Sequence, residues 1–203
     1  MIKIFIFLLF GLVYIKYSNA NLANILYDKI SNSNKVILNG QIDKIMINNL
    51  INRIELMTKS NLDKNVFIII DSIGGDLIEG VNLINWMEES KIKNNLRFEC
   101  ICIKTISTAF VIYQFCDYRY IIDSCLMIQH EPKINIEGTF DFVVNYYQNN
   151  FKIHLNMYKL LVEKISNRLN MDIIDYKNKI NGFDWIIYNN NEMLQNNLAD
   201  EKI

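Results

Sequence analysis

The sequence has little proline, few histidines and no excess of either charge. Its 203 residues include one proline and two histidines, and the formal net charge is −1. A chain without surplus positive charge offers no broad basic surface, so nucleic acid is not an expected partner. Heptads and repeats of fixed period are also missing, which argues against a coiled coil or a solenoid.

Metal-ligand spacing is absent as well. The four cysteines (Cys100, Cys102, Cys116 and Cys125) lie inside apolar strand or helix patterns and not in the pairs typical of zinc sites. We therefore expect buried free thiols, in preference to a disulfide framework or a zinc site. No metal and no cofactor are predicted.

The length and the hydrophobic content favour one domain. With 203 residues and 51% hydrophobic residues, the chain can bury one sizeable core, which we assign to residues 21–203. Residues 1–20 have the pattern of a secretory signal: Lys3, the apolar run Ile4–Ile15, and Ser18-Asn19-Ala20 as cleavage site. The run is shorter than the ~20 residues that a membrane span needs. We expect cleavage after Ala20 and a secretory, organellar or extracytoplasmic location; an uncleaved membrane anchor is the alternative.

The central stretch of the sequence is an apolar run followed by two glycines. Val66–Ile70 is continuous and β-branched, as in a strand that is buried on both faces of a parallel sheet. Asp71–Gly75 predicts a sharp turn, and apolar residues at helical spacing follow it. Such a turn directs backbone N–H groups toward a negatively charged oxygen, although a Gly-Gly pair is equally often only a tight connection.

The remaining segments extend this alternation. The patterns predict strands at 35–40, 98–105, 118–122 and 126–130, and helices at 44–59, 76–89, 107–116, 140–169, 171–180 and 190–196. Residues 183–187 fit a short strand or a loop. Strands that alternate with helices indicate a mostly parallel sheet with right-handed crossovers.

Candidate catalytic residues are few. His130 follows a strand, at the edge where parallel sheets place their active sites, whereas His154 falls in the middle of a helix. Ser107 begins a helix, where a serine is commonly an N-cap. A serine at this place also suits a nucleophile, because the backbone N–H of Thr108 and that of Gly74 or Gly75 could hold the same oxyanion.

These residues resemble a known family, the proteolytic subunit of Clp protease and its superfamily, which includes bacterial signal peptide peptidase A and the crotonase fold. The resemblance covers most of 35–200 and rests on four segments: Lys35–Asp43, Asp71-Ser-Ile-Gly-Gly75, Ser107–Asp117, and Arg119-Tyr120 with His130-Glu131-Pro132. Ser107–Asp117 is more similar to the signal peptide peptidase version of the nucleophile helix.

The resemblance implies an α/β fold of repeated β-β-α units, with a mostly parallel sheet flanked by helices and a long protruding helix. It implies a Ser-His-Asp endopeptidase in which Ser107 attacks the peptide carbonyl and His130 takes its proton. Asp184 matches the third member best, with a one-residue insertion; Asp175 and Asp172 are alternatives.

The same resemblance implies peptide or unfolded polypeptide substrates and a homo-oligomeric ring. After removal of the signal, little chain precedes Lys35 to form the loops that meet a Clp ATPase, so an ATPase partner is not expected.

Three positions depart from the family pattern. Ile73 replaces a proline, and Ile106 and Thr108 replace smaller residues near the nucleophile. A catalytically inactive paralogue that acts as a structural or binding subunit is therefore a second hypothesis. A crotonase-like acyl-CoA enzyme is a third, although no basic patch for nucleotide phosphates lies near the glycine turn.

Overall fold

The computed structural model of the chain describes residues 34–60, 63–132, 137–181 and 186–203. The predicted signal at 1–20 and the predicted triad member Asp184 lie outside the described residues. Within the described ranges, no helix is both long enough and apolar enough to cross a membrane.

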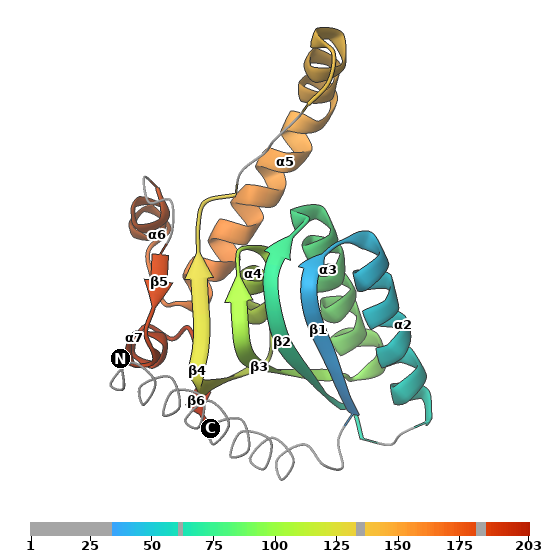
Figure 1. Ribbon diagram of the computed structural model, residues 1–203, viewed down its shortest axis with the longest axis vertical. Helices are drawn as coiled ribbons and strands as arrows, with labels where there is room; N and C mark the ends of the chain where they lie inside the picture. The colour runs from blue at the N-terminus through green and yellow to red at the C-terminus, as the bar shows by residue number, and fades with distance from the viewer. Residues whose placement is uncertain (1–33, 61–62, 133–136, 182–185) are drawn as a thin grey trace, which may run out of the picture.

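In the part of the chain that the structure describes, one sheet of six strands forms the centre (Figure 1). The first four strands are parallel and stand in the order of the sequence, and the short fifth strand pairs antiparallel with the fourth. The strands are β1 (Asn34–Ile42), β2 (Asn65–Gly75), β3 (Arg97–Ile106), β4 (Tyr118–Gln129), β5 (Ile186–Tyr188) and β6 (Glu201–Lys202), the last of which also pairs with β4.

The helices connect the strands and cover the sheet. They are α2 (Lys44–Ser60), α3 (Leu77–Asn94), α4 (Thr108–Gln114), α5 (Phe140–Arg168), α6 (Ile173–Ile180) and α7 (Asn190–Gln195). Their apolar stripes join the main core, which includes Ile54 of α2 and Met87 of α3. The mostly parallel sheet flanked by helices confirms the predicted fold class.

The apolar run in β2 is explained by burial on both faces. Val66, Ile68 and Ile70 belong to the main core under the helices, whereas Phe67 packs in a second cluster with Ile101. Successive side chains of a strand point to opposite faces, so only a strand that is covered on both sides is apolar throughout.

Two details differ from the expectations. The first half of the described chain alternates one strand with one helix, and not two strands with one helix. The strands expected at 118–122 and 126–130 form one strand, β4, because the residues between them bulge without ending the pairing with β3.

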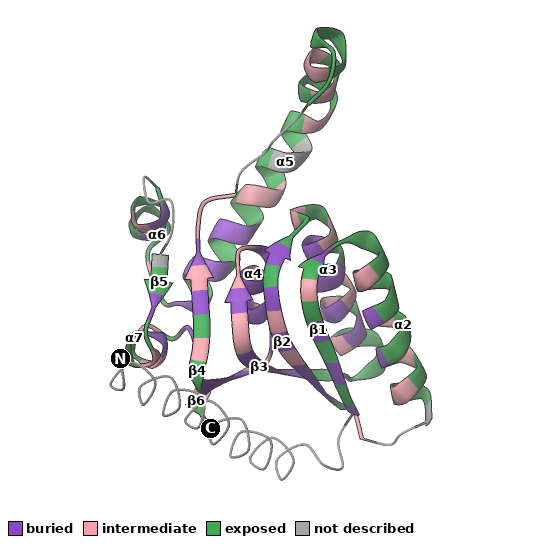
Figure 2. Cartoon of the chain, viewed as in Figure 1, coloured by how far each residue is buried: buried purple, intermediate pink, exposed green. Residues whose placement is uncertain are grey.

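The long helix α5 protrudes from the body, as expected (Figure 1). Only its last part is buried, through Leu161, Val162 and Ile165, while its first part is mostly exposed (Figure 2). Thr139 caps the helix by accepting a hydrogen bond from the N–H of Phe142. The protruding part therefore has few contacts with the core.

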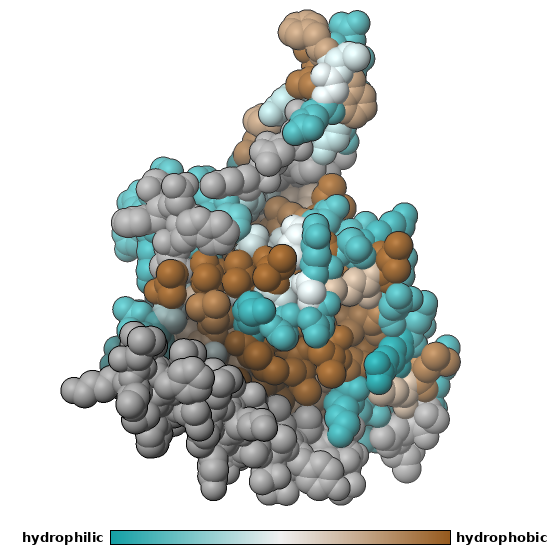
Figure 3. Space-filling model, viewed as in Figure 1, coloured by the Kyte–Doolittle hydropathy of each residue, from teal (hydrophilic) through white to brown (hydrophobic). Residues whose placement is uncertain are grey.

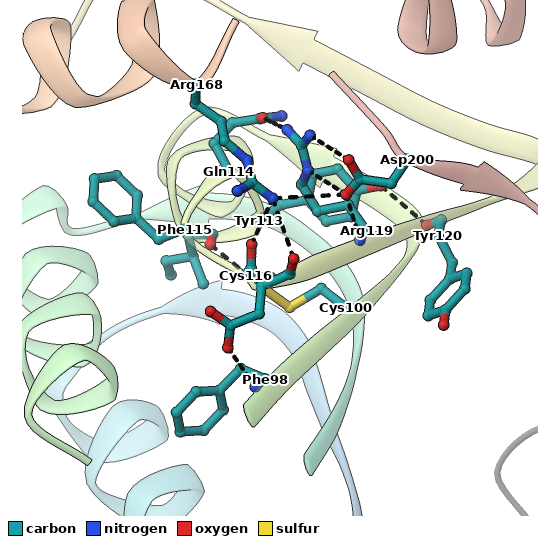
Figure 4. The surroundings of a disulfide bond; sticks show 12 residues. Phe98, Cys100, Tyr113, Gln114, Phe115, Cys116, Arg119, Tyr120, Arg168 and Asp200 are labelled. Atoms are coloured by element: carbon teal, nitrogen blue, oxygen red, sulfur yellow. Dashed lines mark hydrogen bonds and ion pairs between the residues drawn. A yellow bond between two sulfur atoms is a disulfide. The ribbon is translucent and has the colours of Figure 1, made fainter. Parts of the chain in front are cut away.

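The prediction of free thiols is wrong. Cys100 is joined to Cys116 (Figure 4) and Cys102 to Cys125, and no cysteine is free. The apolar surroundings were correctly predicted, but apolar surroundings suit a disulfide as well as a thiol. The pairs follow from strand register and from the position of α4, which spacing along the chain does not reveal.

Candidate active site

A cleft of about 660 Å³ lies at the carboxyl edge of the sheet. The turn between β2 and α3, the start of α4, the end of β4, and helices α5 and α6 all line it. Four of the predicted site residues share this cleft: Gly75, Ser107, Thr108 and His130. The chain thus brings together residues that are distant in sequence, at the edge where parallel sheets bind ligands.

Ser107 has an unusual backbone conformation between β3 and α4. Its φ is 58° and its ψ is −123°, a combination that glycine adopts far more readily than serine. The side chain makes no capping hydrogen bond, so the N-cap alternative does not describe this serine. The Ser107 N–H donates to the carbonyl oxygen of Ile128 at 3.1 Å, which fixes the turn against β4.

The glycine turn packs directly on Ser107. A Cβ atom added to Gly74 would lie 2.5 Å from the carbonyl oxygen of Ile106 and 2.8 Å from the Cβ of Ser107. Gly74 also has a φ of 85°, which favours glycine. The Oγ1 of Thr108 donates to the carbonyl oxygen of Gly75 at 2.9 Å and ties the two turns together.

The predicted oxyanion donors are not equivalent. The N–H of Gly74 donates to the Oγ of Ser72 at 3.1 Å, and that hydroxyl donates to the carbonyl oxygen of Gly40. Thr108 is the first residue of α4, so its N–H has no partner within the helix. Gly75 and Thr108 line the cleft and Gly74 does not, so the first two are the better candidates for the backbone donors.

His130 follows the last residue of β4 and is half-buried. Its Nδ1 atom lies 2.7 Å from the carbonyl oxygen of Glu131. A carbonyl oxygen only accepts, so in the neutral ring Nδ1 carries the proton and Nε2 carries the lone pair. The Glu131 carbonyl thus holds the tautomer that a general base requires.

The third predicted member is not located. Asp184 lies outside the described residues, as stated above. Of the two alternatives, Asp172 caps α6 by accepting from the N–H groups of Ile174 and Asp175, and Asp175 is exposed on the same helix. Neither of these carboxylates lines the cleft.

Sequence reasoning missed Gln129, a buried polar residue of the cleft beside His130. Its amide donates to the hydroxyl of Tyr176 and accepts from that of Tyr188 at 3.0 Å, so it joins β4 to α6 and β5. Burial raises the pKa of Tyr188 to about 12, with a smaller contribution from the charge of Glu192. Burial also raises the pKa of Tyr176, so both tyrosines stay protonated at neutral pH and can donate hydrogen bonds. A polar residue next to a histidine was the only signal in the sequence.

The cleft walls are largely apolar, and their charged residues are acidic. Asp76 and Glu131 line the cleft, but no lysine or arginine does so among the described residues. Tyr158 of α5 donates to Glu131 at 3.5 Å, and its pKa is raised by burial and by that carboxylate. In the described ranges, no group of three histidine, cysteine or acidic residues could hold a metal ion.

The fold and the cleft define a parallel α/β protein whose candidate site lies between a glycine turn and a serine at a helix start. The family model described as Clp protease matches residues 18–175. The chain belongs to the Clp protease family. The match includes Ser107 and His130 and ends before Asp184.

Proposed function

We propose that this protein is a serine endopeptidase that cleaves peptides or unfolded polypeptides. The main support is the conformation of Ser107, an uncapped serine held at a positive φ in the same cleft as His130. Strained backbone of this kind is concentrated at functional sites. Membership of the Clp protease family supports a peptidase.

In the proposed mechanism, the Ser107 hydroxyl attacks the scissile carbonyl and the Nε2 atom of His130 accepts its proton. The N–H groups of Gly75 and Thr108 hold the oxyanion, and His130 then donates the proton to the leaving amine. Asp184 remains the proposed third member. The Glu131 carbonyl orients the His130 ring in any case.

The decisive experiment is labelling with a fluorophosphonate probe, which reacts with activated serines. We expect one adduct, on Ser107, and a loss of peptidase rate of about 10⁴-fold in Ser107→Ala. Ser124→Ala, which changes an exposed serine of β4, is the matched control and should keep the full rate. A folded protein that does not react at Ser107 would contradict the proposal.

A second candidate function is that of an inactive paralogue in a larger assembly. One observation favours it: the Gly74 N–H is engaged by Ser72 and is not available to an oxyanion. This candidate predicts a folded protein that does not react with the probe and copurifies with an active partner.

We further propose that the protein forms a homo-oligomeric ring, as the family generally does. Exposed apolar side chains support this proposal. Phe140 is 81% exposed and Phe151 is 55% exposed on the protruding part of α5. Hydrophobic side chains also gather on the face of the molecule that Figure 3 shows. Light scattering of the purified protein would give the number of subunits.

We also propose that residues 1–20 direct the chain to an extracytoplasmic or organellar compartment. Two disulfides in one domain are typical of an oxidising compartment and support this location. Sequencing of the N-terminus of the protein from its native cells tests the proposal. A mature chain that begins after Ala20 is expected, and one that begins at Met1 would leave only the anchor alternative.

A further inference from the structure

The pairing between β3 and β4 changes register just before the site. Cys102 stands opposite Ile121, but Lys104 stands opposite Leu126, so β4 advances five residues while β3 advances two. The extra residues form a bulge at 122–125. Regular pairing resumes after it and continues to the end of β3.

The residues that follow this bulge carry the candidate site. Ile106 stands opposite Ile128, and the N–H of Ser107 donates to the Ile128 carbonyl oxygen. His130 comes two residues after Ile128. The position of His130 relative to Ser107 therefore depends on how many residues of β4 are taken up in the bulge.

The Cys102–Cys125 disulfide closes across this bulge. Its Cα atoms are 5.7 Å apart, Cys102 is fully buried, and Cys125 is the last residue of the bulge. Each cysteine stands five residues before a candidate catalytic residue: Cys102 before Ser107, which follows β3, and Cys125 before His130, which follows β4. The covalent link thus joins the two strands that carry the site.

Ile122, at the start of the bulge, is 2% exposed and packs in the second cluster with Ile101 and Tyr120, but the middle of the bulge is held only weakly. The side chain of Asp123 is 84% exposed and pairs with Lys202, and its carbonyl oxygen accepts a hydrogen bond from Asn190. Exposed ion pairs contribute little to stability. Without the disulfide, the burial of Ile122 and the pairing of β4 with β5 would still oppose a slip of β4 along β3, but no covalent link would fix the number of residues in the bulge. A slip of one residue would move every following side chain to the opposite face.

We infer that the Cys102–Cys125 disulfide is a positioning cross-link, which sets the register of β4 so that His130 reaches Ser107. The inference rests on the proposed peptidase function, because it concerns the reactivity of Ser107. A dithiol that donates two electrons and two protons breaks the S–S bond, yields two thiols and becomes a cyclic disulfide. Reduction is then expected to lower the reactivity of Ser107.

The other disulfide provides a matched control. Cys100–Cys116 spans 16 residues and Cys102–Cys125 spans 23, so their losses should lower the melting temperature by similar amounts. The end of α4 keeps other contacts without its disulfide, because Arg168 donates to the Cys116 carbonyl oxygen at 3.0 Å and Lys91 donates to that of Phe115. Its removal should therefore leave the site in place.

The experiment compares Cys102→Ala/Cys125→Ala with Cys100→Ala/Cys116→Ala in the full chain. We expect the first variant to react with the fluorophosphonate at least tenfold more slowly and to shift the pH profile of labelling, because His130 is displaced. The second should label at the wild-type rate. Equal rates and equal pH profiles in the wild type and the first variant would overturn the inference.

A second measurement separates this inference from the proposed function. Amide hydrogen exchange of residues 126–129 should be faster in the first variant, and in the wild type after reduction by dithiothreitol, than in the second variant. If the wild type does not label at all, the peptidase proposal fails. The exchange rates alone then test whether the Cys102–Cys125 disulfide sets the register of β4. Unchanged exchange would overturn the inference whatever the labelling shows.

Discussion

Ser107 combines a place in the candidate site with an unfavourable backbone conformation. Its φ of 58° and ψ of −123° place a side chain where a Cβ atom is poorly tolerated. Residues in such conformations persist only where the surrounding structure holds them. Here the hydrogen bond to β4 and the contact with Gly74 provide that support.

The strain at Ser107 can be measured by comparing two variants that both lack its hydroxyl. Ser107→Gly should be more stable than Ser107→Ala by about 1 kcal/mol, because glycine adopts this conformation without a clash. Both variants lose the proposed nucleophile, so activity is not expected to distinguish them. Urea denaturation gives the two free energies of unfolding, and equal values would contradict the prediction.

A comparison of Gly74 with Gly40 separates two effects of an added Cβ atom. One is the clash with neighbouring atoms at the site, and the other is the strain of a positive φ. Both have a positive φ, 85° and 90°, but a Cβ on Gly40 would meet only the end of Met46, at 3.9 Å. Gly40→Ala should therefore cost about 1 kcal/mol of stability and keep the labelling rate. Gly74→Ala should cost more and slow the labelling of Ser107 at least tenfold, since the added methyl displaces Ile106 and Ser107. Equal labelling of the two variants would rule out a role for the close approach.

Some of these residue-level features could be predicted from the sequence, and others could not. Ser107, His130 and the glycine turn were recognised because they follow strands at one edge of a sheet. The hydrogen bond from Gly74 to Ser72 was not predictable, since it depends on the conformation of the turn. The burial of Gln129 against two tyrosines depends on contacts between segments distant in the chain.

At the level of helices and strands, a short window of sequence was sufficient to predict an element whose pattern of burial is the same along its whole length. The double-sided burial of β2 and the apolar stripe of α2 are both visible in short windows. The strand β4 was divided in two because Asp123 and Ser124 are exposed in the middle of it, which resembles a loop. Only the pairing with β3 shows that the strand continues.

Strand β4 is joined to the end of the chain by an ion pair between a buried arginine and a partly exposed aspartate (Figure 4). Arg119 of β4 is 1% exposed, and its guanidinium donates to both carboxylate oxygens of Asp200 at 2.9 Å. Burial alone would raise the pKa of Asp200, but the hydrogen bonds and charge of Arg119, with the charge of Arg168, lower it below the ordinary value.

Asp200→Asn should lower the free energy of unfolding by roughly 2 kcal/mol at pH 7, because it leaves a buried guanidinium without its counter-charge. The loss is smaller than for a fully buried pair, since solvent reaches the Asp200 side chain. Since the pKa of Asp200 is lowered in the folded state, its contribution is present above the unfolded pKa of about 3.9 and is lost as the pH falls through the folded value. The difference between the two proteins should therefore shrink below pH ~4.

Urea denaturation at several pH values between 2 and 7 checks this prediction. Lys93→Ala is the control, because Lys93 forms an exposed pair with Glu89 and its loss should leave the unfolding midpoint unchanged. A constant difference between wild type and Asp200→Asn over the whole pH range would show that the carboxylate charge is not the source of the stability.

At the scale of the whole molecule, packing within a single chain does not account for the exposed apolar side chains on the protruding part of α5. Phe140→Glu should reduce the assembly to smaller species, because it places a charge on an exposed apolar side chain of the proposed contact surface. Ile92→Glu, at a side chain of α3 that is 86% exposed, is the matched control and should leave the mass unchanged. Analytical ultracentrifugation measures both. Identical masses for the two variants would exclude the start of α5 from the contact.

The ion pair between Arg119 and Asp200 has a practical consequence for anyone who shortens this protein. The match to the family ends at residue 175, yet Asp200 lies 25 residues further along the chain. A version cut at the end of the match would keep the buried guanidinium and lose its anion, together with the strands that close one edge of the sheet. The autonomous folding unit therefore extends beyond the recognisable family region, and an expression design has to retain the C-terminal residues.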